Sequence, residues 1–144
     1  MKIAIASDHA GYSLKEALKK LLPELDFEDF GTHDENSMDY PDTGYPAARA
    51  VSNGDCAKGI LICGSGIGMS IIANKVPGIR AALCYYTDFA RLARMHNDSN
   101  ILVLAGRFTT PSYAKQIVET WLNTPFEEGR HKDRLNKIHQ GERN

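Results

Sequence analysis

Residues 59–68 read Gly-Ile-Leu-Ile-Cys-Gly-Ser-Gly-Ile-Gly, and this stretch decides how the rest of the chain is interpreted. Its first half is a continuous apolar run, which is typical of a strand buried on both faces of a parallel sheet. Its second half repeats glycine at Gly64, Gly66 and Gly68, directly before a segment with helical spacing. A buried strand, a glycine-rich turn and a helix predict an α/β protein with its ligand site at the carboxyl end of the strand.

Strand-like and helical segments alternate on both sides of this stretch. Apolar runs predict strands over residues 2–6, 27–30, 59–62, 80–83 and 101–104, of which the second is the weakest. Helical spacing predicts helices over 14–22, 46 to about 53, 69–76, 89–96 and 113–121, with Pro46 in a first turn and an extra polar helix after Gly129. This alternation predicts one α/β domain over residues 1–144. We expect a single doubly wound, Rossmann-like or flavodoxin-like five-stranded parallel sheet with helices on both faces.

Composition narrows the class of protein. Apolar residues make up 42% and charged residues 24% of the 144-residue chain, and the formal net charge is −1. These values offer no bulk electrostatic attraction to nucleic acid or to an anionic membrane. No apolar run approaches the roughly 18 residues that span a bilayer, and the apolar start is too short for a signal peptide. Three cysteines without CxxC spacing argue against a disulfide framework or a zinc site, so we expect a cytoplasmic protein.

The glycine loop is compatible with anion binding. Glycines between a strand and a helix let backbone N–H groups approach an anion closely at the helix N-terminus. The spacing is GxGxG, it follows the third strand, and no acidic residue ends the next strand, so a dinucleotide site is disfavoured. The chain also lacks the GxxxxGK[ST] pattern of a P-loop. A tight turn that serves only close packing of helix on strand stays open as an alternative.

Cys63 stands at the mouth of this loop. A thiol beside a helix N-terminus and several free N–H groups favours its thiolate form, which can act as a base. The alternative is a small buried apolar side chain, which is the usual role of a free cysteine. We interpret Cys56 and Cys84 in that second way.

Further polar residues follow the other strands and the later helices. Asp8 and His9 come directly after the first strand, and Arg107 follows the last one. The carboxyl ends of parallel strands share one edge, so these side chains are expected beside Cys63, although Asp8 also suits a helix N-cap. The remaining candidates lie at or after the fourth helix: His96, Asn97, Arg130 and Arg134. The whole set suits proton abstraction next to a carbonyl on a phosphorylated substrate.

Several motifs resemble the B-type ribose-5-phosphate isomerase family, which also contains the subunits of galactose-6-phosphate isomerase. The matching stretches run from the first strand to the C-terminal helix, at residues 5–11, 38–42, 59–70, 73–75, 78–81, 96–100 and 129–131. The combination of the cysteine-bearing glycine loop with His-Asn-Asp-Ser-Asn and Gly-Arg-His is specific to the family. Ser65 stands where many members carry threonine, and it keeps the hydroxyl.

The resemblance implies a role for each matching residue. Cys63 resembles the base that moves a proton between C1 and C2, with Ser65 shuttling protons between the substrate oxygens. His96 resembles the acid–base group that opens the sugar ring, and Asp8 the group that binds the ring oxygens. The implied substrate-binding set comprises Asp8, His9, Gly64, Ser65, Gly66, Ile67, Gly68, Asn97, Arg107, Arg130 and Arg134. The family needs no metal and no cofactor.

The order of elements predicts that the site is shared between two chains. The fourth helix starts at the carboxyl edge of the sheet and must run back to begin the fifth strand. His96, at the end of that helix, is therefore expected at the opposite edge from its own Cys63. We predict a homodimer with active sites at the interface, in which His96 and Asn97 come from the partner. The sequence leaves open whether such dimers pair into tetramers.

Three functions compete at this point. The first is an aldose–ketose isomerase that interconverts D-ribose 5-phosphate and D-ribulose 5-phosphate through a cis-enediol, as in the pentose phosphate pathway. The second is the same chemistry on a six-carbon sugar phosphate such as allose or galactose 6-phosphate. The third is a non-catalytic phosphate- or nucleotide-binding module. One chain that carries Cys63, His96 and the arginines together favours the first.

Overall fold

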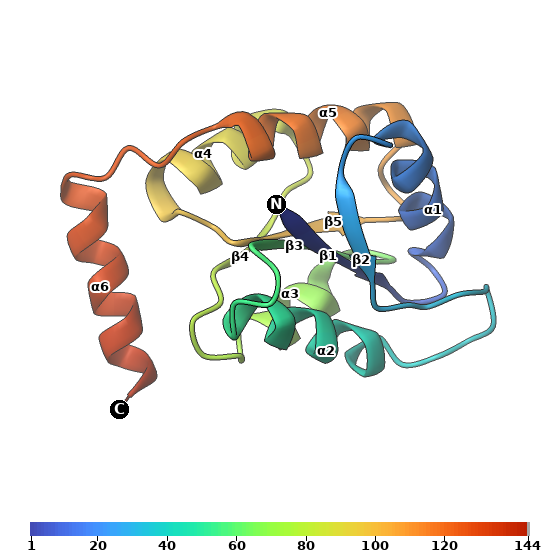
Figure 1. Cartoon of the computed structure of the whole chain (residues 1–144), viewed down its shortest axis with the longest axis horizontal. Coiled ribbons are helices and arrows are strands. Elements are labelled where there is room, and N and C mark those ends of the chain that lie inside the picture. The colour runs from blue at the N-terminus through green and yellow to red at the C-terminus, as the bar shows by residue number, and fades with distance from the viewer. Residues whose placement is uncertain (144) are drawn as a thin grey trace.

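The computed structural model describes residues 1–143 and alternates strands with helices along the chain (Figure 1). The elements in chain order are β1 (Lys2–Ser7), α1 (Tyr12–Leu21), β2 (Asp26–Asp29), α2 (Pro41–Ser52), β3 (Lys58–Cys63), α3 (Ile67–Ala73), β4 (Ala81–Leu83), α4 (Thr87–Asn97), β5 (Ile101–Ala105), α5 (Pro111–Asn123) and α6 (Arg130–Glu142). Every strand predicted from the sequence is present, with each end within one residue of its prediction.

The strands form one parallel sheet in the order β2-β1-β3-β5-β4, which confirms the predicted doubly wound architecture. Helices α1, α4 and α5 cover one face, and α2 and α3 cover the other (Figure 1). The connections β1–β2 and β4–β5 move in one direction along the sheet, and their helices α1 and α4 lie on the first face. The connections β2–β3 and β3–β4 move in the other direction, and their helices α2 and α3 lie on the second face. Right-handed crossovers require this division. The chain reverses its direction along the sheet at β2, so the helices that leave β1 and β3 lie on opposite faces and a crevice opens at the carboxyl ends of these two strands.

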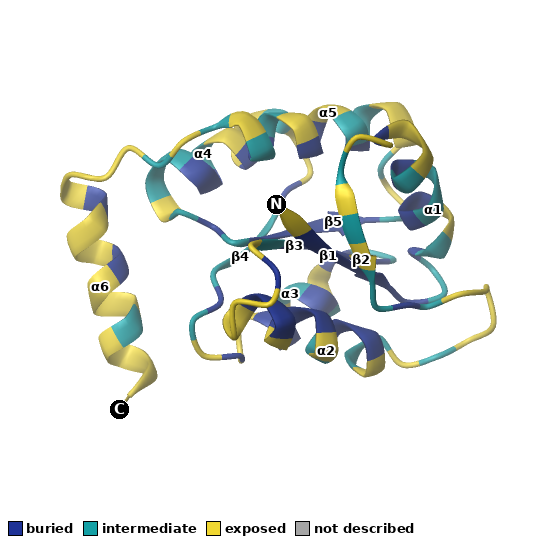
Figure 2. Ribbon diagram, in the orientation of Figure 1, coloured by how far each residue is buried: buried dark blue, intermediate teal, exposed yellow. Residues whose placement is uncertain are grey.

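Alternating strand residues supply two separate cores. In β1, Ile3 and Ile5 pack beneath α1 and α5, whereas Ala4 and Ala6 face α2. The larger side chains face helices that stand further from the sheet, and the alanines let α2 approach closely. This two-sided burial explains why the strands read as continuous apolar runs (Figure 2).

The second helix differs from the sequence prediction. Pro46 does not lie in its first turn; α2 begins at Pro41, and Pro46 falls inside the helix. Pro41 occupies the position where a missing N–H costs nothing, while Pro46 leaves the carbonyl of Asp42 without its helical partner. Both Pro46 and Asp42 are exposed, so water can satisfy that carbonyl. The third helix is also shorter than predicted, because Val76 lies in the turn after α3.

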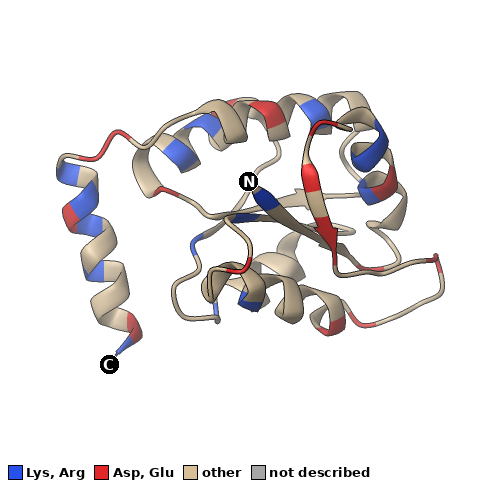
Figure 3. Cartoon of the chain, viewed as in Figure 1, with Lys and Arg blue, Asp and Glu red and all other residues tan. Residues whose placement is uncertain are grey.

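Helix α6 stands apart from the layered body (Figure 1). Its buried residues are His131 and Leu135, and most of its surface is exposed (Figure 2). At its far end, the Gly78 N–H donates to the Glu142 carboxylate at 3.1 Å. Lysine and arginine residues recur along the helix, at Arg130, Lys132, Arg134 and Lys137 (Figure 3). In residues 1–143, no helix combines the length and apolarity that crossing a membrane would need.

A buried ion pair joins α1 to β2. The Lys15 ammonium group is fully buried and lies 2.6 Å from an Asp29 carboxylate oxygen and 3.2 Å from Glu16. Lys19 also bonds Asp29, at 2.8 Å. Burial acts to raise the pKa of Asp29, but the hydrogen bonds from Lys15, Lys19 and the Gly31 N–H outweigh it, so that pKa lies below its ordinary value.

Replacing Asp29 by asparagine should destabilise the fold. Asp29→Asn leaves the buried Lys15 charge with Glu16 as its remaining partner, and we expect a loss of about 2 kcal/mol in urea denaturation at pH 7. Asp26→Asn, an exposed change in the same strand, should cost less than about 0.5 kcal/mol.

The effect of Asp29→Asn should depend on pH in one direction. A carboxylate with a depressed folded-state pKa contributes stability above its unfolded pKa, and this contribution is lost as the pH falls through the folded value. The difference between wild type and Asp29→Asn should therefore shrink in acid. A difference that stayed constant from pH 7 to pH 3 would show that the charge of Asp29 is unimportant.

Candidate active site

A pocket of about 740 Å³ opens at the carboxyl edge of the sheet, where the chain leaves β1 and β3 toward opposite faces. Segments that follow three strands contribute to it, together with the loop before α2. Its lining residues are Asp8, His9, Ala10, Met38, Asp39, Tyr40, Pro41, Asp42, Cys63, Gly64, Ser65, Gly68, Arg107 and Phe108. The predicted crevice at the strand-order switch is therefore present, and it brings together Asp8, His9, Cys63, Ser65 and Arg107.

Cys63 is the last residue of β3, and it is 5% exposed at the wall of the pocket. The strand places it by main-chain bonds, because the Gly106 N–H donates to the Cys63 carbonyl at 2.8 Å. Cys56 and Cys84 are buried away from the pocket, as the sequence predicted for them. Burial raises the pKa of the Cys56 thiol to about 11, with help from the Glu28 carboxylate 3.3 Å away, and burial alone raises that of Cys84 to about 12.

The glycine loop keeps a set of backbone donors free. Within residues 1–143, the N–H groups of Gly64, Ser65, Gly66 and Gly68 have no hydrogen-bond partner. Gly66 has a φ of +79°, and a Cβ there would stand 3.1 Å from the Leu104 carbonyl oxygen. Only glycine accepts both constraints without strain. The turn therefore depends on its glycines, and the same turn leaves several N–H groups available to an anion.

Asp8 and His9 enter the pocket in fixed orientations. One oxygen of the Asp8 carboxylate accepts the Gly11 N–H at 2.9 Å, so Asp8 ties down the turn before α1 while it lines the pocket. The Met38 N–H donates to His9 Nδ1 at 3.2 Å. In a neutral imidazole this contact puts the remaining proton on Nε2. His9 therefore presents an N–H donor away from Met38.

Two parts of the pocket received no role from the sequence. The first is the loop that carries Met38, Asp39 and Tyr40, whose Tyr40 ring packs over Gly68. The second is Phe108, which stands 78% exposed at the rim beside Arg107. The family-like motif at residues 38–42 was a usable signal for the loop. Nothing in the local pattern around Phe108 distinguished it.

The remaining candidates lie outside this pocket. His96 and Asn97 end α4, and the residues that follow them lead to the amino ends of the strands, where the Gly59 N–H donates to the Asn100 carbonyl at 3.0 Å. The prediction that His96 lies at the opposite edge from its own Cys63 is confirmed. Arg130 and Arg134 lie exposed on α6, also away from the pocket.

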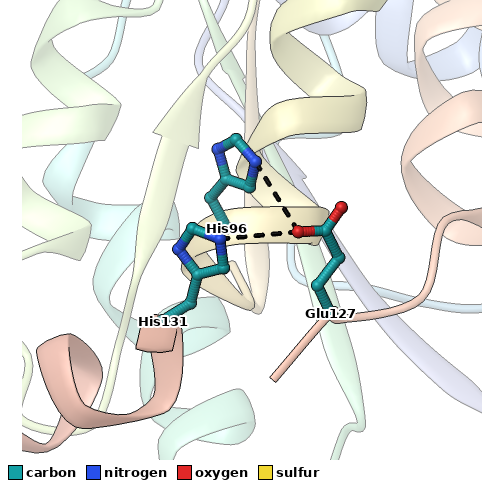
Figure 4. Close-up of side chains that lie close together, drawn as sticks. All are labelled: His96, Glu127 and His131. Atoms are coloured by element: carbon teal, nitrogen blue, oxygen red, sulfur yellow. Dashed lines mark ion pairs between the residues drawn. The ribbon is translucent and has the colours of Figure 1, made fainter. Parts of the chain in front are cut away.

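His96 belongs instead to a cluster with Glu127 and His131 (Figure 4). The two imidazole rings stack with centroids 4.4 Å apart, and a Glu127 carboxylate oxygen lies 3.4 Å from His131 Nε2 and 3.9 Å from His96 Nε2. Burial, and then the positive charges of His96 and Arg130, lower the pKa of His131. In residues 1–143, this is the group of three side chains close enough to share a metal ion.

Solved structures of other proteins match this chain in both fold and sequence. A structure of ribose-5-phosphate isomerase B from Clostridium thermocellum superposes with a TM-score of 0.97 and 50% identity, covering 99% of this chain and 98% of that one. The Mycoplasma genitalium ribose-5-phosphate isomerase B, solved with bound ribulose-5-phosphate, gives 0.93 and 41%, covering 99% and 96%.

Two curated relatives match over nearly their full length. Ribose-5-phosphate isomerase B of Escherichia coli is 43% identical over 95% of this chain and 93% of its own. D-erythrulose-4-phosphate isomerase of Pectobacterium atrosepticum is 40% identical over 96% and 93%. The family model described as Ribose/Galactose Isomerase matches residues 3–138. With that match and these relatives, the chain belongs to the Ribose/Galactose Isomerase family.

Proposed function

We propose that residues 1–144 form one isomerase domain that interconverts D-ribose 5-phosphate and D-ribulose 5-phosphate through a cis-enediolate. The observation that carries this function is that Cys63 and the glycine loop, with its unpaired N–H groups, line the same pocket. The relatives named ribose-5-phosphate isomerase B, one of them holding ribulose-5-phosphate, support the pentose substrate.

The chemistry requires one base and a site for negative charge. With the aldose in open-chain form, the Cys63 thiolate takes the proton from C2, and the electrons move onto the C1 carbonyl oxygen to give an enediolate. The free N–H groups of Gly64, Ser65, Gly66 and Gly68 stabilise that oxyanion, and one such donor is commonly worth about 3 kcal/mol in the transition state. The Ser65 hydroxyl moves a proton between the two oxygens, and the Cys63 thiol returns its proton to C1. No step requires a metal or a cofactor.

Hydrogen-bond donors that line the pocket suit the phosphate. His9 offers its Nε2–H, and the exposed residue Arg107 lines the same pocket and supplies a positive charge. Arginine pairs bind a phosphate dianion with parallel hydrogen bonds. We assign Arg130 and Arg134 to the phosphate site of a partner subunit, because their place on α6 keeps them from their own pocket. Such a charged substrate is confined by membranes, and we infer a cytoplasmic enzyme.

A homodimer would complete the site. His96 would then open the sugar ring, and Asn97 would bind the sugar, in the pocket of the partner chain. Exposed apolar side chains of α3, of α4 with the segment before it, and of the pocket rim support this arrangement: Ile67, Ile71, Tyr85, Tyr86, Phe89 and Phe108. Large apolar side chains that are exposed in one chain are suited to burial in a protein–protein interface.

Other sugar phosphates are the second candidate. The Pectobacterium atrosepticum relative acts on a four-carbon sugar phosphate by its name, and the family description includes galactose isomerases. A pocket of about 740 Å³ holds sugars of either length, so volume does not select among them. A non-catalytic phosphate-binding module is the third candidate, and it would not need the thiol of Cys63.

Cys63→Ala should abolish most of the isomerase activity. Removing a general base typically lowers kcat by about 10²- to 10⁴-fold, and Cys56→Ala provides a matched control because its thiol lies outside the pocket. The measurement is a coupled assay on ribose 5-phosphate, allose 6-phosphate and erythrulose 4-phosphate. Turnover of none of these by the wild type, or full activity in Cys63→Ala, would refute the proposal.

Mixing two inactive variants should restore activity if the site is shared. After subunit exchange between Cys63→Ala and His96→Ala, about half of the dimers are hybrids with one intact site of two, which gives up to about a quarter of wild-type activity. A site built within one chain gives no recovery. Native mass spectrometry of the mixture confirms that hybrids formed, so an inactive mixture that contains them rules out the shared site.

A further inference from the structure

The His96–Glu127–His131 cluster joins three segments at the edge opposite the pocket (Figure 4). His96 lies in the last turn of α4, Glu127 in the segment before α6, and His131 in the first turn of α6. The Glu127 N–H donates to the Met95 carbonyl at 3.0 Å, which holds the Glu127 backbone beside His96. A main-chain hydrogen bond therefore helps to hold Glu127 beside His96, in addition to the contacts between the side chains.

The three donor atoms are uncommitted to other groups. In the part of the chain that the structure describes, the His96 and His131 imidazoles have no polar side-chain partner other than Glu127. The His131 side chain is 7% exposed, whereas those of His96 and Glu127 are 38% and 46% exposed. One donor is thus anchored in the protein, and the other two are free to adjust toward solvent.

The spacing of these donors is close to that of a zinc site. Two histidine nitrogens and one carboxylate oxygen at zinc bond lengths in a tetrahedron lie about 3.3–3.5 Å from one another. Glu127 and His131 already lie 3.4 Å apart, and all three donors lie within 4.8 Å of one another. Rotation of the exposed His96 and Glu127 side chains closes the remaining gap. Imidazole and carboxylate ligands select borderline metals over Mg²⁺ or Ca²⁺.

We propose that His96, Glu127 and His131 form a Zn²⁺ site, with water as the fourth ligand, that links α4 to α6. Occupancy withdraws His96 Nε2 from acid–base work, so the metal inhibits the isomerase; this consequence rests on the proposed function of His96. The nearby Arg130 and Arg134 charges oppose a cation and limit its affinity. Zinc binding is therefore inhibitory and reversible, and the isomerase reaction itself uses no metal ion.

Zinc binding is tested first without reference to activity. Isothermal titration of ZnCl₂ into the full chain with Cys63→Ala, which removes the pocket thiol, should give one Zn²⁺ per chain and a rise in Tm that EDTA reverses. Adding Glu127→Gln or His131→Ala should weaken binding at least about 10-fold. His139→Ala, another α6 histidine with a carboxylate neighbour, should leave binding unchanged. Equal Zn²⁺ affinity with and without His131 would overturn the site.

Inhibition is tested in chains that retain Cys63. Zn²⁺ should lower the rate of wild type and of His139→Ala, while His131→Ala keeps its own metal-free rate at the same Zn²⁺ concentration. Calorimetric binding without inhibition would overturn the inhibitory role. An enzyme with no activity on any sugar phosphate would refute the proposed function, whereas the calorimetry would still decide the metal site.

Discussion

The reversal of chain direction at β2, which places β1 and β3 side by side, is the constraint on which the rest of this structure depends. Right-handed crossovers send α1, which leaves β1, and α3, which leaves β3, to opposite faces of the sheet, so a crevice opens between the carboxyl ends of these two strands. Asp8 and Cys63 lie at this opening because Asp8 directly follows β1 and Cys63 is the last residue of β3. The pocket is therefore a consequence of topology, and its chemistry comes from the residues placed where the strands end.

The same topology separates the chemical groups into two sets. Residues at the ends of strands collect at one edge, while residues at the end of α4 collect at the other. His96 cannot reach its own Cys63 without dismantling the sheet, so a site that uses both must combine two chains. The exposed apolar side chains, such as Tyr86, Phe89 and Phe108, are suited to the interface of the proposed dimer. A dimer would thus bring the His96 of one chain beside the Cys63 of the other, which a single chain cannot do.

The glycine loop shows how packing and function share residues. Gly66 is required by its positive φ and by the nearby Leu104 carbonyl, and Gly68 by the Tyr40 ring above it. These are structural reasons, and they account fully for both glycines. The free N–H groups are a by-product of that turn. Sequence reasoning left packing and anion binding as alternatives, and in the structure close packing and unpaired N–H groups occur together in this loop.

Local patterns in the sequence determined the strands, most of the helices and the grouping of Asp8, His9, Cys63 and Arg107, because strand periodicity and the parallel arrangement need no long-range information. They also placed His96 at the far edge. Tertiary structure alone decided which proline opens α2, that residues 38–42 wall the pocket, and that Glu127 and His131 meet His96. The first depends on competition between two similar local signals, and the other two depend on contacts between segments distant in the chain. The spacing of neighbouring residues predicts neither kind of outcome.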